Sequence, residues 1–174
     1  MSFEFLYITS DIAQSKFVIA QGVDFIFVDM EYIGKAERQP GDTVKNRHTP
    51  NDILQIRESC NPKKLLARIN PYGGHSQDEI ESAISAGATH IMLPMINSNE
   101  AIIGAANAIN GRAALVPLIE TIYSLKNLEQ IITSQICSAT YWWWNQLKFE
   151  CVASIISQLN TNKKKYFQQE VAHD

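Results

Sequence analysis

The stretch ALVPLIETIYSL (residues 114–125) decides the fold, because an apolar run in it stops at a single acid. Five of its first six residues are apolar, which is typical of a strand buried on both faces. Glu120 follows at the point where such a strand would end. This carboxylate therefore needs either a structural or a chemical explanation.

Four further apolar runs precede this one, each followed by an amphipathic segment. The five runs span residues 3–8, 25–30, 65–70, 90–95 and 114–119. From the third run onward the starts lie 25 and 24 residues apart, about the length of one strand and one helix. Apolar strands that alternate with helices predict an α/β fold with a parallel sheet.

The segments between the runs carry the signals of helix ends. Thr49 followed by Pro50 has the pattern of an N-cap and a first helical residue. Capping-box spacing predicts two further helix starts, and glycines predict their ends. These signals are Ser76 with Glu79 and Gly87, then Asn97 with Glu100 and Gly111. The apolar positions 125, 128 and 132 predict a helix after Glu120.

The composition is that of an ordinary globular protein. The 174 residues fit one domain, with 45% hydrophobic and 19% charged side chains. A net charge of −3 gives no basic footprint, so nucleic acid is not an expected partner. We expect no membrane span, because no apolar run nears the required ~20 residues. We expect no signal peptide, because the start MSFEFLYITSD lacks a basic n-region and a cleavage site. Three cysteines without metal or redox spacing favour free thiols and a cytoplasmic location.

Charged side chains gather where the predicted strands end. Asp29 and Glu31 close the second run, Arg68 lies near the end of the third, and Glu120 follows the fifth. Ligand sites of parallel α/β folds form at the carboxyl ends of strands, so we expect one shared pocket. Structural roles also fit: loop caps for the first two acids, an ion pair for Arg68, and a helix-dipole acid for Glu120.

Four blocks of the sequence carry a family resemblance. They are GVDFIFVDMEY (22–32), LLARINP (65–71), AGATHIMLPMINSNEA (86–101) and LVPLIET (115–121). In this order and spacing they resemble the HpcH/HpaI aldolase and citrate lyase β-subunit family, over about residues 22–132. The resemblance implies an α/β fold of the (β/α)8 TIM-barrel type, here incomplete with five to six βα units.

The resemblance also implies a chemistry. The family makes or cleaves carbon–carbon bonds beside a pyruvate-like or acyl-thioester fragment, through an enolate stabilised by Mg²⁺ or Mn²⁺. By the family pattern, Glu120 is a metal ligand and Arg68 holds the substrate carboxylate. Asp29 and Glu31 would form a second acidic group that orders metal-bound water or the long polar loop after them.

Two departures from the family stand out. The family's aldolases carry a histidine base directly after the glutamate of the second strand, and here this residue is Tyr32. Lys35 and Arg38 fit the citrate-lyase-like branch instead, and His48 is an alternative base. The family's second metal-binding aspartate has no counterpart, because no Asp lies between Asp78 and Asp174.

The C-terminal part of the chain reads unlike the family after about residue 135. We interpret the chain as one partial barrel domain, residues 1–174, with an atypical tail from 136 to 174. The three adjacent tryptophans at 142–144 fit either a buried sixth strand or a frameshifted or truncated gene.

The sequence thus predicts a metal-dependent lyase or aldolase for a small 2-oxo acid or acyl-thioester. A catalytically inactive family member that acts through partner contacts is the alternative, and a flavodoxin-like open sheet is a third. A half-closed barrel would leave open strand edges and expose the apolar inner faces of its strands. We therefore expect a homo-oligomer.

Overall fold

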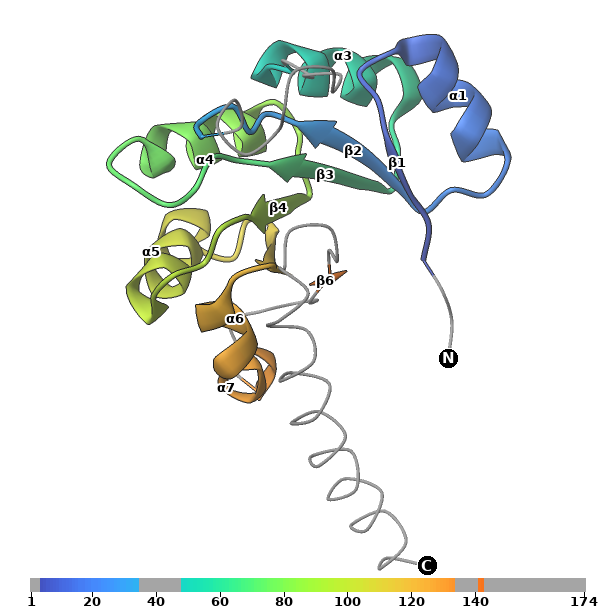
Figure 1. Cartoon of the computed structure of the whole chain (residues 1–174). Coiled ribbons are helices and arrows are strands. Elements are labelled where there is room, and N and C mark those ends of the chain that lie inside the picture. Colours follow the sequence, from blue (N-terminus) through green and yellow to red (C-terminus); the bar gives the residue numbers. More distant parts are fainter. Residues whose placement is uncertain (1–3, 35–47, 134–140, 143–174) are drawn as a thin grey trace, which may run out of the picture.

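The computed structural model describes residues 4–34, 48–133 and 141–142, and these form one parallel sheet with helices between its strands (Figure 1). The strands pair in the order β1-β2-β3-β4-β5-β6. Their bounds are β1 Leu6–Ile8, β2 Phe25–Asp29, β3 Lys64–Arg68, β4 His90–Leu93, β5 Ala114–Ile119 and β6 Tyr141–Trp142. The first five correspond to the five predicted apolar runs, and the sixth lies in the region of the tryptophans.

The helices follow the strands in alternation. They are α1 Ile12–Ala20, α3 Pro50–Cys60, α4 Ser76–Ser85, α5 Asn99–Ile109, α6 Ile122–Lys126 and α7 Leu128–Thr133. The helix predicted after Glu120 is thus two short helices. Asn127 ends α6, and its side-chain amide donates to the carbonyl of Tyr123.

The strand order identifies the barrel-type fold. Parallel strands joined by right-handed crossovers lie in chain order only if every helix covers the same side of the sheet. Figure 1 shows the described helices along one side of a curved sheet. A flavodoxin-like sheet would reverse its order and carry helices on both faces, so that alternative is wrong. The described chain is an incomplete barrel of the predicted class.

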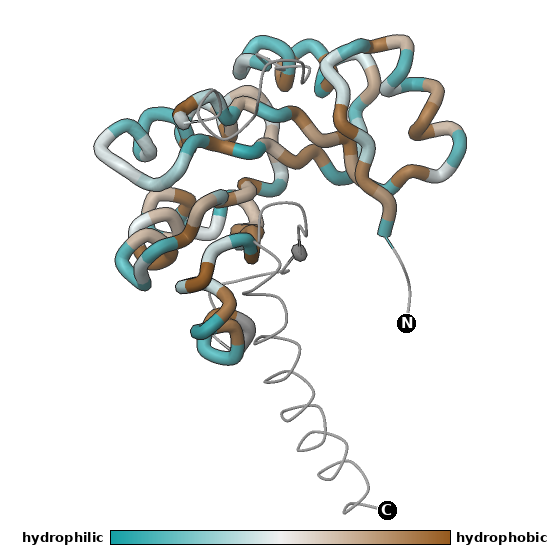
Figure 2. The backbone as a smooth tube through the Cα atoms, viewed as in Figure 1, coloured by the Kyte–Doolittle hydropathy of each residue, from teal (hydrophilic) through white to brown (hydrophobic). Residues whose placement is uncertain are grey.

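Two apolar layers lie on the two faces of the sheet. The larger one packs the strands against the helices, with Ile53 and Ile56 of α3 and Ile80 of α4 among its buried members. Figure 2 shows the strands mainly in hydrophobic colours, while the loops and outer helix turns carry most of the hydrophilic ones. The smaller layer lies on the opposite, inner face and consists of Phe25, Phe27, Leu66, Met92, Val116 and Leu118.

The prediction that the inner faces of the strands are exposed is wrong for this layer. Its six residues are at most 3% exposed. Exposed apolar side chains lie instead at the β1 edge, where Phe5 is 64%, Tyr7 39% and Ile8 38% exposed. β1 ends the order of described strands, so the expected open edge is present there.

The structure confirms one of the three predicted N-caps and corrects the other two. Thr49 caps α3 as predicted and shares a capping box with Asp52. The N-cap of α4 is His75 rather than Ser76, and that of α5 is Ser98 rather than Asn97. The Ser76 hydroxyl accepts from Gly73 N–H instead, because the loop before α4 turns back onto it.

Several predictions fall outside the described residues. These are the roles of Lys35 and Arg38 and the nature of the tail from 136 to 174, apart from the two residues of β6. Among the described helices, none has the length and apolar character needed to cross a bilayer.

Candidate functional site

Asp29 and Arg68 lie side by side at the carboxyl ends of two neighbouring strands. Each is the last residue of its strand, and the parallel register places them opposite each other. Alternate residues of a strand share a face, so both side chains continue the inner face on which Phe27 and Leu66 lie. The cationic carbon of Arg68 lies 5.5 Å from the centre of the Phe27 ring.

A bidentate ion pair joins Asp29 and Arg68. Arg68 Nε donates to Oδ1 of Asp29 at 2.8 Å, and Nη2 donates to Oδ2 at 2.7 Å. Glu31 adds a second carboxylate, with its Oε2 atom 3.4 Å from Arg68 Nε. Both acids are buried, so water screens these charges weakly. The ion pair that the sequence allowed as a structural role for Arg68 is therefore present.

The charges around Arg68 fix its protonation state. Burial of the guanidinium acts to lower the pKa of Arg68, but the hydrogen bond and charge of Asp29 act in the opposite direction. The charges of Glu31 and Glu120 add to this, and the net result is a pKa raised above its ordinary value. Arg68 is thus a permanent, partly buried cation with three acids around it.

Glu120 occupies the corresponding position after β5. Its side chain is buried, and its Oε1 atom accepts a hydrogen bond of 2.9 Å from the backbone N–H of Met95. Met95 follows β4 and has a φ of +50°, a left-handed conformation that is uncommon for a residue with a side chain. The structure thus brings the three predicted acids and the arginine to one edge of the sheet. We call Asp29, Glu31, Arg68 and Glu120 the strand-tip cluster.

Sequence reasoning missed one polar residue beside the cluster. Asn70 follows β3 and is fully buried, and its Oδ1 atom accepts from the N–H groups of Tyr32 and Ile33. Its own amide groups donate to the carboxylate of Glu79 on α4. The available signal was a polar residue directly after the apolar run LLARI, where a strand is about to leave the sheet.

His48 has a structural contact in the ligand-free chain. Its Nδ1 atom accepts a 3.0 Å hydrogen bond from the backbone N–H of Asp29. The N–H groups of Phe25 and Asp29 both face the β1 edge, and β1 stops at Ile8, before it can pair with the second one. His48 therefore supplies the acceptor where the pairing of β1 with β2 ends. The lone pair of its Nδ1 atom is used in this hydrogen bond. Its role as a base stays a prediction.

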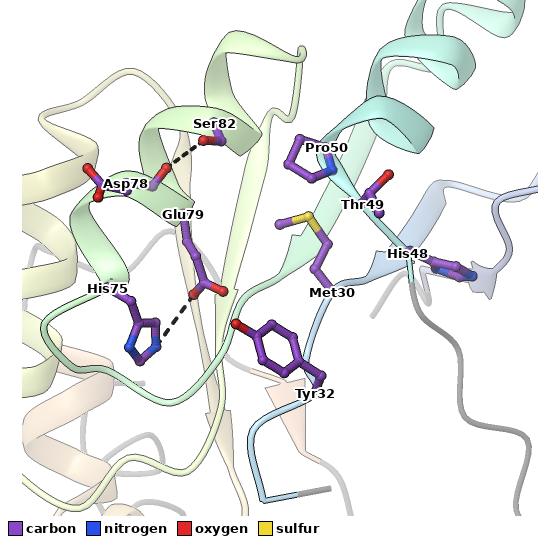
Figure 3. Close-up of a pocket in the computed structure, with 9 residues that line it drawn as sticks. All are labelled: Met30, Tyr32, His48, Thr49, Pro50, His75, Asp78, Glu79 and Ser82. Carbon is purple, nitrogen blue, oxygen red and sulfur yellow. Dashed lines mark hydrogen bonds and ion pairs between the residues drawn. The ribbon is translucent and has the colours of Figure 1, made fainter.

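A separate pocket of about 660 Å³ lies between the starts of α3 and α4 (Figure 3). Its described lining residues are Met30, Tyr32, His48, Thr49, Pro50, His75, Asp78, Glu79 and Ser82. None of them belongs to the strand-tip cluster. His48 and His75 lie at opposite ends of the pocket, and Tyr32 stands in the middle with its hydroxyl turned toward Glu79. The pocket is on the helix side of the β2 tip, whereas the buried charges lie on the inner side.

The strand-tip cluster fits a divalent cation only in part. Carboxylate oxygen is the ligand that Mg²⁺ and Mn²⁺ prefer, and Glu120 offers one such group. Asp29 and Glu31 are held by Arg68. Within residues 4–34, 48–133 and 141–142, no three His, Cys, Asp or Glu side chains come together as a metal site. The type of donor suits the ion, but the number falls short of a protein cage.

Comparison with known proteins gives structural neighbours without sequence relatives. No family model matches the chain, and no curated protein matches it. A tryptophan synthase α chain from Legionella pneumophila subsp. pneumophila is similar in structure, with a TM-score of 0.56 and 11% identity over 91% of this chain. A 2,3-dimethylmalate lyase, a PEP mutase/isocitrate lyase superfamily member, has a TM-score of 0.54 and 14% identity over 90%. A phosphonopyruvate hydrolase in complex with oxalate and Mg²⁺ has a TM-score of 0.55 and 14% identity over 88%.

These likenesses show the fold alone. The chain spans 67% of the tryptophan synthase chain, 61% of the lyase and 63% of the hydrolase. At such identities the shared feature is the arrangement of strands and helices, and a barrel hosts many unrelated activities. None of the three is named as an HpcH/HpaI aldolase or citrate lyase, so that family resemblance stays a prediction.

Proposed function

We propose that the strand-tip cluster binds a small 2-oxo acid or acyl-thioester and is the site of a metal-dependent carbon–carbon lyase or aldolase reaction. The observation that carries the proposal is the partly buried Arg68 at the carboxyl end of a barrel strand, fixed by Asp29 from the neighbouring strand. In barrel enzymes this end of the strands is where substrates bind. A lyase and an oxalate-binding hydrolase among the structural neighbours also support it.

Arg68 is suited to hold the carboxylate of such a substrate. Asp29 uses the Nε and Nη2 edge of the guanidinium, and no described residue bonds to Nη1. The outer edge, Nη1 with the second hydrogen of Nη2, matches a carboxylate in two parallel bonds. The Arg68 side chain is 14% exposed, so part of it can be reached from outside the cluster.

The charge balance of the cluster favours a cation as the second ligand. Three buried carboxylates surround one guanidinium, so an incoming carboxylate would add to an excess of negative charge. Glu120 is the residue that would hold the Mg²⁺ or Mn²⁺, and its carboxylate is oriented by Met95 N–H. When bound, the ion stabilises the negative charge of an enolate. Asp29 and Glu31 keep Arg68 charged and in place.

Calorimetry with oxalate tests this proposal. Oxalate should bind more tightly when Mg²⁺ or Mn²⁺ is present, and the ion should bind more tightly when oxalate is present, because linkage is reciprocal. Glu120→Ala should abolish the coupling, whereas Glu129→Ala, a carboxylate on α7, should leave it unchanged. Independent binding, or no binding of either ligand, would contradict the proposal.

A second candidate function is a catalytically inactive barrel that acts through partner contacts. It is favoured by the metal-ligand count, since the described residues supply no three-ligand site. Such a protein would bind neither ligand in the coupled manner above and would show no turnover that depends on Glu120.

A further inference from the structure

The loop after β2 is fixed by an unbroken series of hydrogen bonds. Asp29 N–H donates to His48 Nδ1, and Met30 N–H donates to the carbonyl of Arg68. Glu31 N–H donates to Asp29 Oδ1 at 3.2 Å. The next two N–H groups, of Tyr32 and Ile33, both donate to Asn70 Oδ1, at 2.9 and 2.8 Å. Five successive backbone donors thus have partners, although this segment belongs to no strand or helix after Asp29.

Asn70 in turn has little freedom to move. Its backbone N–H donates to Glu79 Oε2 at 3.2 Å, and its side-chain Nδ2 donates to Glu79 Oε1. The side chain is completely buried, so no water competes for these bonds. Because Nδ2 faces a carboxylate, Oδ1 must face the loop. Glu79 therefore sets the orientation of the amide, and α4 is tied through it to the tip of β2.

We propose that Asn70 is a positioning residue of the strand-tip site, held by Glu79, and that it acts by keeping Glu31 against Arg68. Glu31 immediately precedes the two N–H groups that Asn70 binds, and its carboxylate lies 3.4 Å from Arg68 Nε. Without Asn70, the partly buried N–H groups of Tyr32 and Ile33 would lose this shared acceptor, and the loop would shift to recover one. This inference rests on the proposed function only for its effect on ligand binding.

A ligand-free measurement tests the positioning itself. We expect Asn70→Ala to shift the NMR signal of Arg68 Nε, because the Glu31 carboxylate, 3.4 Å from this atom, moves away while the hydrogen bond to Asp29 stays. Glu31→Gln should change the same NMR signal in the same direction. Asn127→Ala is the matched control, since it also removes an asparagine side chain that hydrogen-bonds to the backbone, here to the carbonyl of Tyr123 outside the cluster. An unchanged Arg68 signal in folded Asn70→Ala would overturn the inference.

A double-mutant cycle separates positioning from a general loss of stability. The effect of Glu31→Gln on oxalate affinity with Mg²⁺ should be several-fold in the wild type and should vanish in the Asn70→Ala background. Additive effects would overturn the inference, because two independent roles would add. If the wild type binds no oxalate, the proposed function fails, and the NMR signal of Arg68 Nε alone decides the role of Asn70. Glu79→Gln, which leaves Asn70 in place, should give a smaller change and serves if Asn70→Ala does not fold.

Discussion

Arg68 and Asp29 are register partners on adjacent strands and are joined by two hydrogen bonds of 2.8 and 2.7 Å. The pair lies at the carboxyl ends of β2 and β3 beside Glu31, with Asp29 buried and Arg68 partly buried. It therefore has two consequences: it stabilises the sheet edge, and it fixes which edge of the guanidinium remains for a ligand. Loss of either partner would leave a buried charge, which is the costly case for an ion pair.

Arg68→Lys tests the bidentate geometry of the guanidinium separately from its positive charge. Lysine keeps the positive charge but cannot bind Asp29 and a substrate carboxylate in parallel pairs of bonds. We expect oxalate affinity to fall by about 1–3 kcal/mol and the free energy of unfolding by about 1–2 kcal/mol. Calorimetry and urea unfolding measure the two effects. Arg112→Lys is the control for oxalate binding, because Arg112 bonds to Glu81 and to backbone carbonyls of α5 outside the cluster and should leave the oxalate affinity unchanged. Unchanged oxalate affinity would remove Arg68 from the binding site.

His48→Ala should act on stability rather than on proton transfer. It leaves the N–H of Asp29 without its acceptor, so we expect a loss of about 1–2 kcal/mol in the free energy of unfolding. His75→Ala is the comparison, and it should cost less, because His75 Nε2 makes only a 3.7 Å contact with Glu79 and no hydrogen bond within the described residues. A large fall in kcat with unchanged stability would instead make His48 the base.

The stability of the protein should fall in weak acid through His90. Burial lowers the pKa of His90, the charge of Lys64 lowers it further, and Glu4 opposes the shift. The unfolded chain therefore takes up the proton first, near pH ~6.5. The stabilisation is present above that pH and is lost as pH falls through the lower, folded-state pKa. Urea unfolding at about pH 7.5 and about pH 5 should show a smaller difference for His90→Gln than for the wild type. An equal difference would exclude His90 as its source.

Metal affinity and turnover should both be weak. One carboxylate contributes little charge to a hard divalent ion and leaves most of its shell to water and substrate. Release of pyruvate from a 2-oxo acid aldol, with Mg²⁺ or Mn²⁺, should be slow or undetectable against Glu120→Ala as the blank. Robust turnover that depends on Glu120 would show that another part of the chain supplies a ligand.

Association should involve the β1 edge. This edge carries exposed apolar side chains, including Phe5, and an unpaired strand edge favours pairing with another chain. We expect light scattering at micromolar concentration to show an oligomer, and Phe5→Lys to shift it toward the monomer. Phe17→Lys is the matched control, since Phe17 is 66% exposed but lies on α1. A monomeric wild type would contradict this expectation.

The sequence alone determined the repeating unit and the placement of the charged residues. Apolar runs and helix signals are local properties, so β2 to β5 begin within one residue of the predicted positions. Because strand ends in a parallel sheet meet at one edge, Asp29, Arg68 and Glu120 could be placed there without coordinates. The family resemblance predicted a barrel-type sheet, and the sheet confirms it, because its strands pair in the order in which they occur in the chain.

Only the tertiary structure decided which groups these residues bind. Arg68 pairs with Asp29, 39 positions away in the chain, because the register of two strands sets them opposite each other. Glu79 has the spacing of a capping box with Ser76, yet its carboxylate binds Asn70. Local spacing describes what a side chain can reach within its own helix. Which distant donor actually lies there depends on how α4 packs beside the tip of β3, and that is a property of the folded chain.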